Sequence, residues 1–379
     1  MSEKNKNILL WVITCSIIVF GIGGLLVFSY FYSNQCYTAY EVISETPRSD
    51  SNNGSYQYFQ KNLLKYSGNG ISLIDYRGKN IWNAGFEMKQ VQVDTCAESV
   101  IAADIGGNTF CVYNGRDEGV SMETTYPIER ARVSEQGLAA VLEQDTDSDN
   151  LKVYNPRANS KKLLVEIPTN VTDEGYPLDY DISPDGTSLV AAYMTTTGTE
   201  AKCRLNFYNF SDVGQDKNIL VGGREYDDIM IAGISFTDND HVIIYRENGF
   251  DVFSNMKEPV QILEMDFDGV IMSIADSPDY IGVITGDVSM ENKRLHVYNM
   301  KGKEILNIPV SYEYSVFRIY GDEFFFYGAH HLDIVRMNGR PKFSCDFDIE
   351  LDGVFPSGRS TDYIILDYNS IKRIRIKAG

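Results

Sequence analysis

The sequence predicts an all-β protein, a β-propeller preceded by a single N-terminal transmembrane helix. Residues 8–32 contain no charged side chain, and about 20 apolar residues are enough to span the hydrocarbon core of a bilayer. From Tyr56 onward, short runs rich in Val, Ile, Tyr and Phe alternate with Asn, Asp and Gly turns, as strands do. We therefore divide the chain into a cytoplasmic tail (1–7), a transmembrane signal anchor (8–32), a juxtamembrane segment and linker (33–55) and an extracytoplasmic propeller (56–379).

The charges beside the apolar run predict its orientation. Lys4 and Lys6 precede the run, whereas no Lys or Arg follows it before Arg48. Positive flanks stay in the cytoplasm, so we expect a single-pass protein of the cell membrane with its C-terminal domain outside. A cleaved signal peptide would have a shorter apolar core and small residues at the cleavage site, where this chain is bulky. A lipoprotein would use Cys36, but the residues before it are polar.

The charge of the domain excludes one class of partner. The chain carries a formal net charge of −19, of which the first 36 residues contribute +1, so −20 remains on the rest. Nucleic-acid binding needs a basic footprint, and an acidic domain is also repelled by anionic lipid. The simplest interpretation of the charge is that it keeps the domain soluble.

The cysteine pattern does not indicate a fold held by disulfides. Such folds are short and dense in Cys, whereas here six Cys are spread over 379 residues. Cys15 lies in the predicted span, and five remain, an odd number: Cys36, Cys96, Cys111, Cys203 and Cys345. Cys96 and Cys111 are a conceivable pair, and we otherwise expect mostly buried free thiols.

A strand–turn–strand repeat runs through the domain. Its aligned positions are spaced 37, 41, 54, 45, 45 and 38 residues apart: Tyr76, Tyr113, Tyr154, Tyr208, Phe253, Tyr298 and Arg336. A period in the forties, filled by four short strands, is the spacing of a propeller blade. The repeat would contain the third strand, a turn and the outer fourth strand. We expect its tyrosines, together with Trp82, to pack the blades against one another.

The two ends of the domain predict the number of blades. Residues 354–376 supply three strands and then the pattern stops, and residues 38–45 can supply the missing fourth strand. That closure gives eight blades, which we favour. If residues 57–70 share a blade with the C-terminus instead, there are seven. Ring closure buries the apolar faces of the blades and leaves only short outer edges.

Two short motifs carry a resemblance to known propellers. Gly78-Lys79-Asn80-Ile81-Trp82 resembles the Gly-Lys-x-x-Trp repeat of PQQ-like propellers, and Ser183-Pro184-Asp185-Gly186 resembles a turn of TolB-like and WD40-like propellers. The whole chain resembles a family of uncharacterised membrane-anchored propellers of Firmicutes, a domain of unknown function, which implies the fold but no activity. Beyond the span there is one Trp, so the Trp set of quinoprotein dehydrogenases is absent and we expect no cofactor.

Metal ligands are sparse in the sequence. Asp145, Asp147 and Asp149 alternate as in a calcium loop, but Asn150 replaces the required Gly and Pro156 the bidentate Glu. We interpret the segment as a solvated hairpin turn. The four histidines are placed in strands (His241 and His296) or at a hairpin turn (His330 and His331), where packing or a position at the channel mouth is expected.

The loops carry the remaining candidates for binding. Tyr126, Tyr176 and Tyr226 could line one end of a propeller, where aromatic side chains favour protein or glycan contacts. The longest blade contains an extra loop at residues 194–202, the most suitable place for an added function.

Two functions from different classes remain open. The first is a non-enzymatic scaffold that binds a protein or a cell-wall component, favoured by the anchor, the repeat and the absence of a nucleophile or metal-protease motif. The second is an extracytoplasmic hydrolase or lyase with its site at the channel mouth. Its first candidate catalytic carboxylates are those of Asp179, Asp181 and Asp228. We favour the scaffold.

Overall fold

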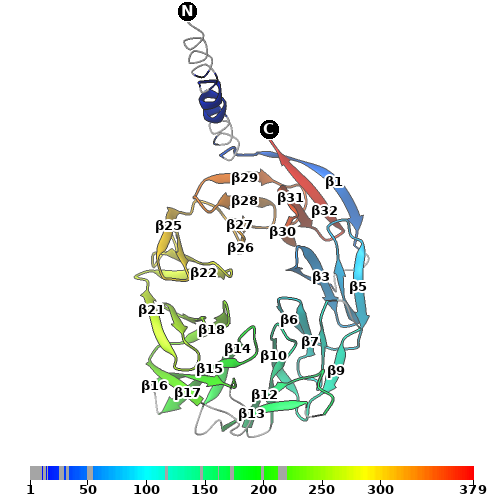
Figure 1. Ribbon diagram of the computed structural model, residues 1–379, viewed down its shortest axis with the longest axis vertical. Helices are drawn as coiled ribbons and strands as arrows, with labels where there is room; N and C mark the ends of the chain where they lie inside the picture. The colour runs from blue at the N-terminus through cyan, green and yellow to red at the C-terminus, as the bar shows by residue number, and fades with distance from the viewer. Residues whose placement is uncertain are drawn as a thin grey trace, which may run out of the picture.

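The structure is a computed structural model. It describes residues 11, 14, 16–24, 30, 34–48, 54–115, 118–145, 148–160, 162–170, 175–197, 200–211 and 220–379. The alternation of apolar residues and turns produces eight antiparallel sheets of four strands each, arranged as blades in a ring (Figure 1). The predicted all-β propeller is therefore confirmed.

The strands follow one another along the chain with short connections. Their bounds are β1 (Ala39–Pro47), β2 (Ser55–Phe59), β3 (Asn62–Ser67), β4 (Gly70–Ile74), β5 (Asn80–Gly85), β6 (Val91–Cys96), β7 (Ser99–Asp104), β8 (Thr109–Tyr113), β9 (Val120–Glu123), β10 (Ile128–Val133), β11 (Ala139–Gln144), β12 (Ser148–Tyr154), β13 (Leu163–Asn170), β14 (Tyr176–Ile182), β15 (Ser188–Thr197), β16 (Glu200–Asn209), β17 (Leu220–Asp227), β18 (Ile231–Phe236), β19 (Val242–Arg246), β20 (Gly249–Ser254), β21 (Val260–Asp266), β22 (Val270–Asp276), β23 (Tyr280–Gly286), β24 (Arg294–Asn299), β25 (Glu304–Pro309), β26 (Val316–Tyr320), β27 (Glu323–Tyr327), β28 (His331–Arg336), β29 (Pro341–Asp346), β30 (Gly353–Ser357), β31 (Arg359–Leu366) and β32 (Ser370–Lys377).

Both ends of the domain build the last blade. β30, β31 and β32 form three strands of this sheet, and β1 adds the fourth by pairing antiparallel with β32, from Ala39 opposite Lys377 to Pro47 opposite Ser370. The strand expected at residues 38–45 corresponds to β1. The seven-blade alternative is wrong, because β2 to β5 form a complete sheet of their own. We number the blades from this sheet, as blade one, to the closing sheet, as blade eight.

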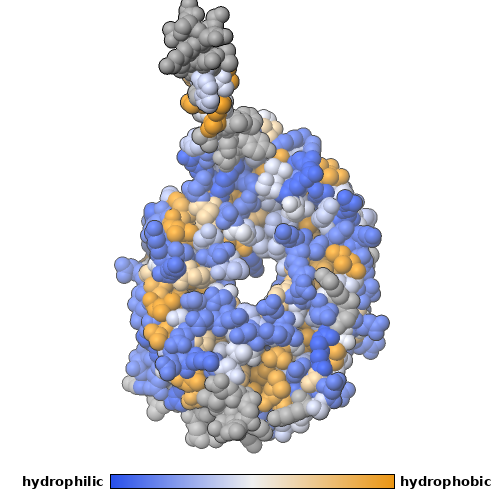
Figure 2. Space-filling model, in the orientation of Figure 1, coloured by the Kyte–Doolittle hydropathy of each residue, from blue (hydrophilic) through white to orange (hydrophobic). Residues whose placement is uncertain are grey.

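Each blade runs from the inside of the ring to the outside. The first strand lies beside the central channel and the fourth strand forms the rim, with β6, β10, β14 and β18 among the inner strands (Figure 1). The channel is open in the space-filling view (Figure 2). The aligned repeat positions lie in third strands, apart from Tyr76, which lies two residues after the end of β4. The predicted register of the repeat within the blade is therefore correct.

The antiparallel order gives the ring two distinct ends. We call one end the entry face: every first strand begins there, and the turns between second and third strands lie there too. The other end, the exit face, carries the turns between first and second and between third and fourth strands. Since β1 runs from Ala39 to Pro47 beside the third strand of blade eight, the chain enters the ring at the exit face.

The segment before β1 also contacts blade seven. Tyr37 forms a parallel bridge with Phe343 of β29, with the Tyr37 N–H donating to the Lys342 carbonyl at 2.8 Å. Residues 16–24 are helical, and this helix leaves the ring beside β29 (Figure 1). No helix within the described residues is long and apolar enough to span a membrane. Much of the predicted span at 8–32 lies outside the described residues.

The cysteines agree only in part with the expectation. Cys36, Cys96, Cys111, Cys203 and Cys345 are all free thiols, but only Cys111 and Cys203 are buried. The conceivable pair of Cys96 and Cys111 is wrong, because Cys96 ends β6, Cys111 lies in β8, and β7 runs between them. Cys15 lies outside the described residues.

The extra segment at residues 194–202 is not a loop. β15 extends to Thr197 and β16 begins at Glu200, and the two strands pair over their full length of ten residues. The added residues therefore lengthen a hairpin of blade four. Pairing in a hairpin satisfies the backbone hydrogen-bonding groups of the paired residues in this segment. The polar sequence of this segment gave no indication that it would form strands.

Candidate functional site

The inner strands carry polar side chains at alternate positions, and these side chains hold neighbouring blades together. In blade two, Gln92 accepts a hydrogen bond from the Ala131 N–H at 3.0 Å, and Asp94 accepts one from the Val133 N–H at 2.9 Å. Because alternate residues of a strand share one face, both side chains reach the inner strand of blade three. The first strand of a blade thus uses side chains to extend the hydrogen bonding of the next blade.

Blade four repeats this arrangement with two aspartates. Asp179 accepts a hydrogen bond from the Ile234 N–H at 2.9 Å, and Asp181 accepts one from the Phe236 N–H at 2.8 Å. Asp179 also forms ion pairs with two arginines of blade three, Arg130 and Arg132, the latter at 3.2 Å. Charge-assisted bonds of this kind are stronger than neutral ones.

Three carboxylates surround Arg132 on the channel wall. Burial lowers the pKa of Arg132, but the nearby carboxylates of Asp94, Asp181 and Asp179 outweigh it and raise that pKa. Burial raises the pKa of Asp181 to about 7 and also raises the pKa of Asp94, although Arg132 acts against both shifts. Burial likewise raises the pKa of the nearby Cys96 thiol to about 12, so this thiol stays protonated and unreactive at neutral pH.

These bonds change the interpretation of the suspected catalytic carboxylates. Asp179 and Asp181 are both hydrogen-bonded to backbone of the next blade, so each already has a structural role at the blade interface. Asp228 lies apart from them, exposed after β17 with a φ of 55°. The structure therefore does not bring the three together as one site. The polar pairs two residues apart in first strands were the signal in the sequence for this interface: Gln92 and Asp94, Arg130 and Arg132, Asp179 and Asp181.

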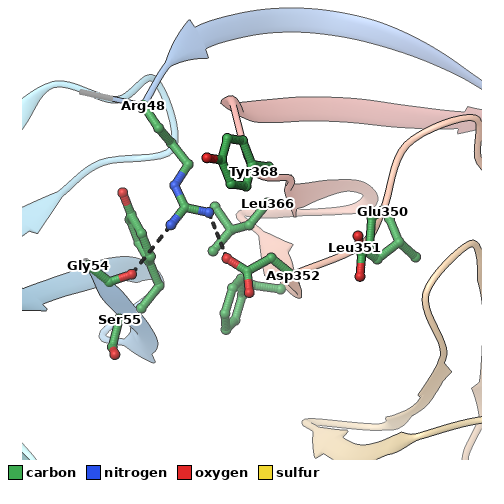
Figure 3. Close-up of a pocket in the computed structure, with 10 residues that line it drawn as sticks. Arg48, Gly54, Ser55, Glu350, Leu351, Asp352, Leu366 and Tyr368 are labelled. Atoms are coloured by element: carbon green, nitrogen blue, oxygen red, sulfur yellow. Dashed lines mark hydrogen bonds and ion pairs between the residues drawn. The ribbon is translucent and has the colours of Figure 1, made fainter. Parts of the chain in front are cut away.

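A pocket lies at the entry face where blade eight meets blade one. It encloses about 560 Å³, and Arg48 projects into it from the end of β1 (Figure 3). The Arg48 side chain is only 3% exposed and forms an ion pair of 2.6 Å with Asp352. It also donates to the carbonyls of Asp367 at 2.8 Å and Gly54 at 3.4 Å. Arg48 thus joins the two blades at the point where the ring closes.

The chemistry of this pocket is mixed. Phe355 is among its apolar lining residues. Leu366 adds a second apolar side chain, whereas Glu350 and Tyr368 add an exposed carboxylate and an exposed phenol (Figure 3). The sequence showed Arg48 only as the first cation after the apolar run, and two of its partners, Asp352 and Asp367, lie about 300 residues further along the chain. A local sequence pattern therefore could not have predicted these contacts of Arg48.

The predicted metal candidates are dispersed. Asp145 lies in the turn between β11 and β12, where its N–H donates to the Ser148 carbonyl at 2.9 Å. Asp149 lies inside β12 and is buried, and burial raises its pKa. Asp147 lies outside the described residues. Among the residues that the structure describes, no group of three His, Cys, Asp or Glu is placed to hold a metal ion.

The histidines all have polar partners. His241 precedes β19 and contacts Asp238 at 2.9 Å, and His296 in β24 contacts Glu304 at 2.9 Å. His330 lies at the entry face with Nδ1 3.0 Å from the Ile349 carbonyl. His331 begins β28 instead of lying in the turn. Burial lowers its pKa, but Asp346, at 2.6 Å, and Asp333, at 3.0 Å, outweigh that effect and raise it.

The aromatic residues of the repeat lie at the interfaces between blades. Tyr113 stacks on Trp82 of the preceding blade with ring centroids 5.6 Å apart. The corresponding contacts are Tyr154 with Phe110 at 5.7 Å, Phe253 with Phe207 at 4.9 Å, and Tyr298 with Phe250 at 5.5 Å. Tyr208 belongs to the apolar cluster between blades three and four, and Tyr76 contacts the Arg373 guanidinium of blade eight at 4.5 Å.

The three tyrosines expected at the rim are placed differently from one another. Tyr176, the first residue of β14, is 59% exposed at the entry face, and Tyr126 is half-buried there beside Lys152. Tyr226 is buried, and its hydroxyl donates to Asp251 at 2.6 Å. Its place on the surface was wrongly predicted, because its strand position turns the ring into the apolar cluster between blades four and five.

Eight four-stranded blades around an open channel define a β-propeller domain. The chain belongs to the Family of unknown function (DUF5711), which matches residues 33–376. No curated protein matches this sequence.

Solved structures with a similar fold come from varied sources. BamB from Moraxella catarrhalis has a TM-score of 0.53 at 10% identity, covering 90% of this chain and 99% of that chain. Sqt1 from Saccharomyces cerevisiae has a TM-score of 0.54 at 11% identity, covering 89% and 99%. A eukaryotic initiation factor has a TM-score of 0.55 at 12% identity, covering 89% and 87%. At such identities the likeness extends to the fold alone.

Proposed function

We propose that this chain is a membrane-anchored, extracytoplasmic propeller that acts as a non-enzymatic scaffold for a protein or cell-wall partner. The observation that carries the proposal is where large apolar side chains are exposed. Among the residues that the structure describes, six exposed apolar residues lie at the entry face, either in turns or at the first position of an inner strand: Tyr176, Met230, Val270, Val288, Met290 and Tyr368. Exposed apolar groups framed by polar residues mark interaction surfaces.

The exit face differs from the entry face in this respect. Among its described turns, none carries a large hydrophobic side chain that is exposed, although Leu220 and Val260, the first residues of the outer strands β17 and β21, are exposed at this end. The other exposed apolar residues lie on outer strands, such as Val260 and Ile262 of β21, or in the N-terminal helical segment. Rigid blades held by inner-wall hydrogen bonds would present the entry face as a preorganised surface, which lowers the entropic cost of binding.

The location is part of the proposal. Its support is the uncharged run at residues 8–32 and the lysines before it, Lys4 and Lys6, which favour a cytoplasmic N-terminus. The acidic domain would then stand outside the membrane, with repulsion from anionic lipid keeping it off the bilayer.

Cross-linking in living cells tests the scaffold function. The full chain is cross-linked in place, purified under denaturing conditions, and its covalent partners are identified. We expect a specific protein or wall polymer, lost when Tyr176 and Tyr368 at the entry face are both replaced by Ser. A matched control replaces Val260 and Ile262, which are exposed on β21, by Ser. Absence of any partner, or turnover of glycan or peptide libraries by the purified chain, would contradict the scaffold.

A further inference from the structure

The most exposed apolar residue among the described residues of the domain, Val288, lies on a hairpin of blade six that also carries Met290. Residues 287–293 connect β23 and β24 at the entry face, and Val288 is 93% exposed and Met290 60% exposed. Val270, the first residue of β22, is also exposed and pairs with Gly286 at the base of this hairpin. We call Val270, Val288 and Met290 the hairpin patch.

Asp287 forms hydrogen bonds across this hairpin. Its side chain accepts hydrogen bonds from the Glu291 N–H at 2.8 Å and from the Asn292 amide at 2.7 Å, and these bonds lower its pKa. Its backbone pairs with Met290 and Glu291 as well. Met290 and Asn292 both have positive φ, 59° and 49°, a region that residues other than Gly adopt at a cost. The exposed side chains are thus displayed by an ordered turn.

Two flexible side chains, those of Met272 and Lys293, lie beside the hairpin patch. Gly286 lies against the Met272 thioether, so a flexible side chain supports the base of the hairpin. The Lys293 side chain contacts the Tyr314 ring, and its ammonium nitrogen lies 5.6 Å from the ring centroid. The single lysine of the hairpin is therefore directed to an aromatic partner in blade seven.

The charge around the patch is strongly negative. Turns at the entry face of blades five and six carry five acidic side chains that reach solvent: Asp228, Glu247, Asp268, Asp287 and Glu291. Blades seven and eight add Glu313 and the three acids of 348–352. In the described turns between strands at this face of blades five to eight, Lys293 is joined only by Arg48, which follows β1 and is paired with Asp352. Carboxylates of one sign around an apolar patch raise the local concentration of cationic partners.

We propose that the hairpin patch binds a cationic, amphipathic segment of a partner protein. The apolar side chain of that segment would pack on Val288 and Met290, and its Lys or Arg residues would face Asp268, Glu291 and Glu313. Met side chains suit such a surface because they adapt to the shape of the bound residue. This inference rests on the proposed scaffold function and names the chemistry of its partner.

Synthetic peptides test the chemistry of the patch directly. The full chain in zwitterionic detergent is titrated with three fluorescent peptides of equal length, in which Lys alternates with Leu, Lys with Ser, or Glu with Leu. We expect the Lys/Leu peptide to bind most tightly, with an affinity that falls as salt is added. Equal binding of the Lys/Ser peptide would overturn the apolar part of the proposal.

Paired variants locate the binding. Val288→Ser with Met290→Ser should weaken binding of the Lys/Leu peptide at least about tenfold, since burying one such side chain is worth that much. The matched control, Val260→Ser with Ile262→Ser, removes two exposed apolar side chains from β21 and should bind as the unaltered chain does. Melting curves of both variants should match the unaltered chain, because the replaced side chains are exposed.

The outcomes separate this inference from the scaffold function. Equal affinities of the unaltered chain and the hairpin variant would mean that the peptide adsorbs to the acidic surface at large, which would overturn the inference. A partner that is cross-linked in cells by the unaltered chain and equally by the hairpin variant would also overturn it, while the scaffold function would stand. If neither chain captures a partner, the scaffold function itself fails.

Discussion

Single aromatic residues hold successive blades together at equivalent positions. Trp82 and Tyr113 join blades one and two, and the same position in later blades is filled by Tyr154, Phe253 and Tyr298. Offset or tilted aromatic pairs contribute beyond the area that they bury. The identity and spacing of these residues could be predicted from the sequence because the repeat places them once in each blade.

Trp82→Ala should lower the free energy of unfolding by about 3 kcal/mol, the lower end of the range for large aromatic residues, because the ring is half-buried. The loss of stacking on Tyr113 is the physical cause. Chemical denaturation of the purified chain measures it. Trp82→Phe serves as the control, since it keeps an aromatic ring and removes an indole N–H that has no hydrogen-bond partner. An unchanged unfolding curve for Trp82→Ala would contradict the packing role.

Asp181 should make stability depend on pH near neutrality. Burial raises its pKa from 3.8 to about 7, so the folded state holds this proton more tightly than the unfolded chain does. Its contribution to stability is fully present below about pH 4 and is lost as the pH rises through about 7. Asp181→Asn cannot ionise. Relative to this variant, the unaltered chain should lose about 2 kcal/mol between pH 5 and pH 8, allowing for partial solvent access.

Urea unfolding at intervals across that range measures the difference. The groups that face Asp181 also titrate or carry charge, chiefly Asp94 and Arg132, so the comparison uses the difference between the two chains at each pH. Asp238→Asn is a suitable control, because the pKa of Asp238 is lowered and its contribution has the opposite sign. A stability difference between the unaltered chain and Asp181→Asn that is constant with pH would contradict the assignment.

Among the strands, β1 has the greatest effect on the architecture. It could be predicted from the sequence because the last blade lacks a strand and residues 38–45 alternate suitably. The extension of β15 and β16 was missed, since polar, Thr-rich strands at the end of a hairpin have no apolar alternation to reveal them. Asp149 was placed in a turn for a similar reason, although it lies within β12.

Removal of β1 should destabilise the ring. A chain that begins at Ser55 lacks the partner of β32, which leaves a sheet edge unpaired and exposes the buried Ile374 and Ile376. A chain that begins at Tyr37 keeps both β1 and the bridge to Phe343. Differential scanning calorimetry of the two chains should show a clearly lower melting temperature for the shorter one. Equal melting temperatures would mean that β1 contributes nothing to closure.

At the scale of the molecule, the ring has two chemically different ends. The exposed apolar residues of the described turns lie at the entry face, where blades five to eight also carry acidic side chains, but these residues come from turns far apart in the sequence. The sequence could predict turns and acidic composition, yet it could not assign each turn to an end before the strand order was known. Contacts between blade eight and blade one, such as the ion pair of Arg48 with Asp352, could not be predicted for the same reason.

The proposed orientation can be checked with protease added to intact cells whose wall has been permeabilised. We expect degradation of the propeller and protection of the first residues, because Lys4 and Lys6 favour retention of the N-terminus in the cytoplasm. Immunoblots against epitopes placed at each end of the chain report the outcome. Survival of residues 40–379 until the membrane is lysed would reverse the orientation.

The pairing of β1 with β32 also sets the order in which the ring can be completed. β1 is made before every other strand of the ring, and its partner β32 is made more than 300 residues later. At about 5–20 residues per second, the ribosome needs roughly 15–65 s to pass from β1 to that partner. Until then the nascent chain carries an unmatched strand at its leading end, available to a chaperone or to a neighbouring copy of the same chain. The emergence of β32 from the ribosome is therefore the earliest moment at which this ring can close.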